Sequence, residues 1–163
     1  MKTNVNRVIK TMAATVLACA IFATPSFAAD GPHDKAIKAR QALMQLYSYN
    51  LGILGAMAKE KAPYDAAAAS DAAANLLAAV SMKQGTLWPA GSDSETAGNK
   101  ENRALESIWS TYPKIAEAGK EMMEAATALN AAAGNGLDAL QGAMGAAGKS
   151  CKGCHDDFRA EKK

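Results

Sequence analysis

The stretch LDALQGAMGAAGKSCKGCHDDFRA, residues 137–160, decides the fold. Its apolar and small side chains recur every three or four residues, which is the spacing of one face of an α-helix. These positions are Leu137, Leu140, Met144, Ala147, Cys151, Cys154 and Phe158. The glycines of Gly134-Asn135-Gly136 mark a turn just before the stretch. The sequence therefore predicts a helix that buries one face and ends in a cysteine pair.

Three earlier segments show the same helical rhythm. They span residues 34–59, 65–83 and 102–133. Asp65 is a suitable N-cap for the second, whereas Pro113 should kink the third or mark its real start. Residues 91–99 are rich in Gly, Ser and acidic side chains and predict a surface loop. Since no segment shows the alternation of a strand, the chain predicts an all-α, antiparallel four-helix bundle.

The first residues have the pattern of an export signal. Lys2, Arg7 and Lys10 precede an apolar run, and Ser26-Phe27-Ala28 offers a cleavage site. We therefore expect a signal peptide at 1–28, a single domain at 29–163 and a periplasmic location. The apolar run is too short for a comfortable membrane span, so no stable membrane anchor is expected. A lipoprotein attachment at Cys19 is an alternative, although it would make the apolar run unusually short.

Charge narrows the choice of partner once the signal is set aside. The three basic residues of the signal leave 15 of the 18 Lys and Arg, against 16 Asp and Glu. Such a nearly neutral domain is not typical of proteins that bind nucleic acid or an anionic membrane.

The motif Cys151-Lys152-Gly153-Cys154-His155 carries the chemistry. Covalent haem attachment needs two thiols for the porphyrin vinyl groups and an imidazole that reaches the iron. On a helix these three side chains share one face, and the cysteines continue the apolar seam of their helix. The motif therefore predicts one covalent haem c inside the bundle, with His155 as an iron ligand.

Other functions of the two cysteines have less support. A thioredoxin-like pair would need a βαβ setting, which this sequence lacks. A structural zinc site needs four ligands, and the only other histidine is His33. A plain disulfide between Cys151 and Cys154 is the remaining alternative.

Arg40 stands in the apolar seam of the 34–59 helix. A buried arginine is costly unless it is paired, and the haem propionates are carboxylates that a guanidinium binds well. We therefore expect Arg40, assisted by Gln41, to bind the propionates. The alternative is that Arg40 extends to solvent from the end of the bundle.

Six methionines follow the signal and are candidates for the second axial ligand of the iron. They are Met44, Met57, Met82, Met122, Met123 and Met144. A methionine at helical spacing is usually part of a core. Met44 differs because it lies one turn after Arg40 and would be aimed at the porphyrin centre if Arg40 held the propionates.

Several segments resemble the cytochrome c′ family, the class II c-type cytochromes. They are CKGCHDDFR (151–159), IKARQALM (37–44), LWP (87–89) and IW (108–109). The likeness covers nearly all of residues 29–163, and it implies a four-helix bundle with a haem near its C-terminus. It also implies that His155 is the proximal ligand and that Cys151 and Cys154 form thioether links.

The resemblance assigns further roles around the haem. It implies that Arg40 and Gln41 neighbour the propionates, that Trp88 packs beside the haem, and that Arg159 is a cation near the proximal imidazole. Trp88 could equally be ordinary core, and Arg159 an ordinary helix-end cation. Family members often form dimers through their first two helices, so the resemblance also admits a homodimer.

The family divides according to the distal residue, which here is Met44. Low-spin members place a methionine there and carry electrons, whereas high-spin members leave the iron open to nitric oxide or carbon monoxide. LGAMAK (54–59) and PYD (63–65) resemble the low-spin branch. We therefore expect a one-electron carrier that exchanges electrons with periplasmic redox proteins, with gas binding as the alternative. The sequence shows no acid–base pair of the kind that would indicate an enzyme, so we do not expect catalysis.

Overall fold

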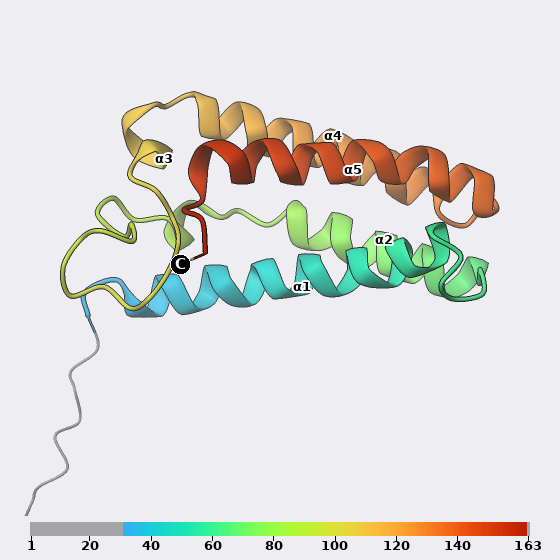
Figure 1. Cartoon of the computed structure of the whole chain (residues 1–163), viewed down its shortest axis with the longest axis horizontal. Coiled ribbons are helices and arrows are strands. Elements are labelled where there is room, and N and C mark those ends of the chain that lie inside the picture. Colours follow the sequence, from blue (N-terminus) through green and yellow to red (C-terminus); the bar gives the residue numbers. More distant parts are fainter. Residues whose placement is uncertain (1–30, 163) are drawn as a thin grey trace, which may run out of the picture.

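Four long helices form the molecule in the computed structural model, which describes residues 31–162. They are α1 (Asp34–Ala58), α2 (Ala66–Val80), α4 (Lys114–Ala132) and α5 (Leu137–Phe158). Successive long helices run in opposite directions (Figure 1). Two short elements, η1 (Gly85–Leu87) and α3 (Ser107–Ser110), lie in the connection between α2 and α4. The prediction of an all-α antiparallel four-helix bundle is confirmed, while the expected signal peptide at 1–28 lies outside the described residues.

The helix ends follow from local chemistry. Asp65 caps α2 as expected, because its carboxylate accepts a hydrogen bond from Ala68 N at 2.8 Å. The helix expected over 102–133 begins only at Lys114, so Pro113 marks its real start and does not kink it. The chain breaks at Pro113, whose carbonyl instead accepts the first hydrogen bonds of α4.

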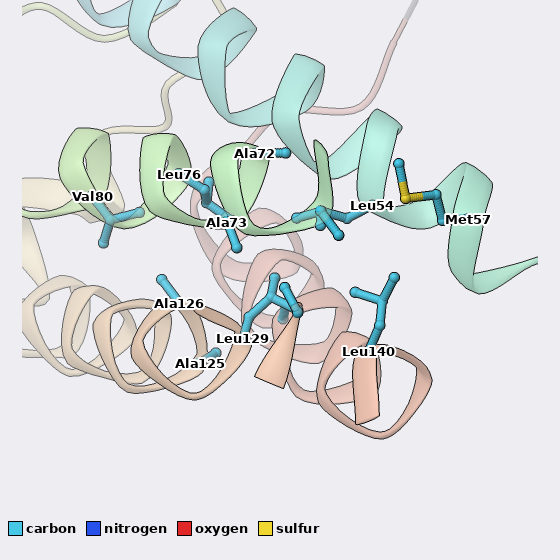
Figure 2. Packing of buried hydrophobic residues seen from close by; sticks show 13 residues of the cluster. Leu54, Met57, Ala72, Ala73, Leu76, Val80, Ala125, Ala126, Leu129 and Leu140 are labelled. Atoms are coloured by element: carbon cyan, nitrogen blue, oxygen red, sulfur yellow. The ribbon is translucent and has the colours of Figure 1, made fainter. Parts of the chain in front are cut away.

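Most of the core is one group of buried apolar side chains, here called the major cluster. It includes Leu54 and Met57 of α1, Leu76 of α2, Leu129 of α4 and Leu140 of α5. Leu54, Leu129 and Leu140 converge between the helices (Figure 2). Burying each such side chain contributes on the order of 2 kcal/mol, so this cluster holds the four helices together.

A second, separate group of apolar side chains lies towards the end of α5 and is here called the minor cluster. Ala104, Ile108 and Phe158 are its buried members. Trp88, Trp109, Ile115, Ala118 and Cys154 pack against them. The helices thus join two apolar clusters, and the cysteine motif belongs to the minor one.

Within residues 31–162, no helix is both long and apolar enough to cross a membrane.

Candidate haem-binding site

Cys151, Cys154 and His155 lie in the last turns of α5, on the face that the helical spacing predicts. Both cysteines carry free, half-buried thiols that are not joined in a disulfide. Burial raises the pKa of each thiol, and for Cys154 the neighbouring Cys151 and Asp157 raise the pKa further. The site therefore offers two neutral thiols and an imidazole on one helix face, which is the donor set that haem attachment requires.

His155 has a cationic surrounding. Burial lowers its pKa, and the positive charges of Arg159 and Arg103 lower it further, while Asp156 acts in the opposite direction. Arg159 Nη1 lies 3.3 Å from Nε2 of His155. A lowered pKa keeps the imidazole neutral, and the neutral form is the one that binds a metal.

The chain just beyond His155 is tied to the connection between α2 and α4. Ala104 and Arg159 form an isolated antiparallel bridge. Two backbone hydrogen bonds flank it, from Leu105 N to Phe158 O (3.0 Å) and from Ala160 N to Arg103 O (2.9 Å). This pairing fixes the C-terminal end of α5 against residues 103–105 (Figure 1).

Arg40 is buried in α1, with 3% of its surface exposed, and its partners come from the chain after α2. Nη1 donates to Ser92 Oγ at 2.6 Å, and Nη2 donates to Ser92 O and to Asn102 Oδ1 (3.0 Å). The guanidinium also lies over the Trp88 ring, 4.7 Å from its centroid. Burial lowers the pKa of Arg40, and the nearby carboxylate of Asp93 opposes that shift.

These contacts give Arg40 partners within the protein itself. Arg40 does not depend on a haem carboxylate for a partner, because Ser92 and Asn102 already satisfy three of its hydrogen bonds. Gln41 is similarly engaged, since its Nε2 donates to Glu101 O at 2.9 Å. These bonds use three of the five N–H groups of the guanidinium, and binding of propionates by Arg40 and Gln41 stays a prediction.

Met44 lies between the two apolar clusters. It is half-buried on α1, one turn after Arg40, which contacts Trp88 of the minor cluster. One turn further along is Tyr47, which packs against the major cluster. Along α5, Cys151 has the same intermediate position, between Ala147 of the major cluster and Cys154. Met44 on α1 and Cys151 on α5 therefore both lie, along their helices, between the contacts to the major cluster and the contacts to the minor cluster, a position here called the junction.

Two further side chains lie close to Cys151 at this junction. Met122 Sδ of α4 lies 3.9 Å from Cys151 Sγ and 3.3 Å from Ser150 Oγ. Tyr47 donates its hydroxyl proton to Ala79 O at 3.3 Å and accepts a hydrogen bond from Gln84 Nε2 at 2.8 Å. Met122 is one of the six candidate methionines, but the sequence did not distinguish it or Tyr47 from other core positions, because apolar and aromatic residues at helical spacing resemble any core position.

Trp88 packs against the minor cluster, as Cys154 does. Its carbonyl accepts a hydrogen bond from Trp109 Nε1 at 3.0 Å, and both indoles pack against the minor cluster. Trp88 therefore bridges Arg40 and the surroundings of Cys154. Its position fits a haem neighbour, although that role stays a prediction.

Comparison with known proteins gives a consistent result. The family model described as Cytochrome C' matches residues 35–159. Cytochrome c-554 of Cereibacter sphaeroides is 44% identical over 126 residues, which are 77% of this chain and 93% of the relative.

Solved structures extend the likeness to three dimensions. Cytochrome c′ from Rhodobacter spheriodes gives a TM-score of 0.75 at 35% identity, covering 78% of this chain and 97% of that chain. A ferrous variant of cytochrome c prime from Alcaligenes xylosoxidans, solved with bound NO, gives a TM-score of 0.66 at 29% identity. That match covers 78% of this chain and 94% of the other.

Proposed function

The chain belongs to the cytochrome c′ family and is thus a monohaem c-type cytochrome with one covalent haem c; from this premise we propose that it is a periplasmic one-electron carrier. Its iron is bound by His155 and Met44. The observation that carries the proposal is the position of Met44 at the junction of the two clusters, one turn from Arg40.

The ligand pair explains why electron transfer is favoured over chemistry at the iron. Ligation by histidine and methionine raises the reduction potential and closes both axial positions. The relative at 44% identity is named cytochrome c-554, which is consistent with membership of the low-spin branch.

The other residues of the site have supporting roles in this proposal. Cys151 and Cys154 form the thioether links. Arg40 and Gln41 donate to the propionates from the end of the bundle, and Trp88 packs against the macrocycle. None of these residues is proposed to act as a catalyst, since a closed coordination shell leaves no position for a substrate.

The expected partners follow from the same reasoning. The signal at 1–28 would deliver this chain to the periplasm, so its electron donor and acceptor are periplasmic redox proteins. Neither nucleic acid nor a membrane anchor is involved. A homodimer through α1 and α2 is supported by the exposed apolar side chains Leu46 and Tyr49 on α1.

Gas binding is the second candidate function. The structural relative from Alcaligenes xylosoxidans was solved with bound NO, so the fold accommodates a gas ligand in that protein. In this alternative Met44 lines the distal pocket without binding the iron.

The ferric absorption and resonance spectra of the haem-loaded protein decide between the two functions. We expect a six-coordinate low-spin ferric spectrum, which the substitution Met44→Ala converts to a high-spin spectrum. After reduction to the ferrous state, the Met44→Ala variant should bind carbon monoxide and the parent protein should not. Met122→Leu is the matched control, because it removes a methionine beside Cys151 and should leave the spectrum low-spin. A high-spin parent protein, or a Met44→Ala variant that stays low-spin, would contradict ligation by Met44.

A further inference from the structure

A second arginine, Arg103, lies on the proximal side of the site. It belongs to the connection between α2 and α4, which is distant in sequence from the haem motif, but its backbone pairs with the chain just after His155. Its backbone is fixed by the hydrogen bond from Ala160 N to Arg103 O (2.9 Å), next to the bridge between Ala104 and Arg159. The positive charge of Arg103 acts on the imidazole in the same direction as that of Arg159.

The two arginines are held in different ways. Arg159 follows directly from α5, and its N–H donates to His155 O at 3.2 Å, so its position depends on the helix end. Arg103 depends on the pairing of residues 103–105 with 158–160. The nearby carboxylate of Asp156 is exposed and paired with Lys152, which weakens its opposing effect. The net field at the imidazole is therefore positive.

We propose that Arg103 is an electrostatic tuning residue, which the 103–105/158–160 pairing holds beside the proximal ligand so that its charge raises the reduction potential of the haem. Ferric iron carries one more positive charge than ferrous iron, and a nearby fixed cation therefore disfavours the ferric state. An arginine suits this function because it stays protonated at any physiological pH. The inference rests on His155 as the proximal ligand, but it does not depend on Met44.

The test is a redox titration of the haem-loaded protein at low ionic strength. Arg103→Gln should lower the midpoint potential of the one-electron Fe(III)/Fe(II) couple, and Arg103→Lys should keep most of the parent value. Lys100→Gln is the matched control, since it removes the same charge from an exposed position on the same connection. Salt should reduce the difference between parent and Arg103→Gln, because Arg103 is only partly buried and its charge is partly screened.

A second variant separates the charge of Arg103 from the 103–105/158–160 pairing that positions it. Ala160→Pro removes the N–H that donates to Arg103 O, and the extended backbone of Arg159 (φ −127°, ψ 121°) is compatible with a following proline. This variant keeps both arginines, yet it should lower the potential because Arg103 is released.

Three results would overturn the proposal: an unchanged potential in Arg103→Gln, an equal shift in Lys100→Gln, or a loss in Arg103→Lys as large as in Arg103→Gln. Each is distinguishable from failure of the proposed function. The spin state reports on Met44, whereas the difference in potential between the two Arg103 variants reports on charge alone.

Discussion

Arg40 and Asp93 are two buried charges that interact without forming a direct ion pair. Arg40 donates to Ser92 and Asn102, whereas the carboxylate of Asp93 accepts from Thr96 Oγ1 and from the backbone N–H groups of Glu95 and Thr96, all at 2.8 Å. Each charge is thus satisfied locally by hydrogen bonds. Together they order the connection that covers the haem end of the bundle.

Asp93 should make stability depend on pH. The hydrogen bond from Thr96 is the main reason why its pKa lies below the ordinary value of 3.8. A depressed pKa in the folded state means that the ionised carboxylate stabilises the fold above pH 3.8, and that this contribution is lost as the pH falls through the lower, folded-state pKa. Asp93→Asn should therefore lower the free energy of unfolding by about 1–3 kcal/mol at pH 7, because hydrogen bonds to a charged acceptor are lost.

Urea denaturation of parent and Asp93→Asn at neutral and acid pH checks this prediction. The difference between them should shrink below pH 3.8. Asp71→Asn, at an exposed position on α2, is the control and should change stability by less than about 0.5 kcal/mol. A difference that stays constant down to acid pH would show that packing, and not charge, explains the effect.

At the scale of single residues, sequence identified the chemistry but not all of its neighbours. Cys151, Cys154 and His155 could be predicted because a contiguous motif on one helix has only one geometry. Ser92 and Arg103 could not be predicted, because they contact Arg40 and the His155 end of α5 from a connection without periodicity. Contacts between segments far apart in sequence leave no pattern in either segment.

At the scale of elements, caps and breakers predicted helix ends better than spacing predicted burial. Asp65 and Pro113 mark real boundaries, since each acts through its own backbone or side chain. On α1, however, Leu43 is buried, while Met44, which follows Arg40 by one turn in the expected seam, is half-buried. The buried face of a helix is wider than a single row of positions, so spacing alone does not determine which of two adjacent residues on that face is more buried.

One side chain connects the α1–α2 loop with the α4–α5 loop, at the end of the bundle opposite the haem site. Tyr64, between α1 and α2, donates to Ala133 O at 2.8 Å and accepts from Gly136 N at 2.9 Å. Tyr64→Phe removes both hydrogen bonds and should lower the free energy of unfolding by about 1–3 kcal/mol, because Ala133 is fully buried.

Chemical denaturation measures this change directly. Tyr49→Phe removes the same hydroxyl from a tyrosine that is 68% exposed on α1 and should leave stability unchanged. Equal effects of the two substitutions would mean that the hydrogen bonds of Tyr64 between the α1–α2 and α4–α5 loops do not stabilise the fold. The ferric spectrum should be the same in both variants, since neither residue is near Cys151.

At the scale of the whole molecule, the core is divided unequally. The major cluster draws on all four long helices, whereas the minor cluster is small and consists largely of the connection, α3 and the end of α5. Arg40, Gln41 and the 103–105/158–160 pairing fasten that connection to both sides of the site. The half that binds the haem therefore has less apolar packing of its own than the opposite half.

This asymmetry predicts how the protein responds to loss of its haem. A ligand bound only by the folded state stabilises that state, and the gain is largest in the region that contacts it. In the chain produced without haem, hydrogen exchange should accelerate at residues 103–105 and 158–160, while the amides around Leu76 and Leu129 in the major cluster stay protected. Mass spectrometry of the haem-loaded and haem-free chains measures both regions in one experiment. Equal acceleration in the two regions would mean that the bundle unfolds as one unit and that the major cluster does not stand without the haem.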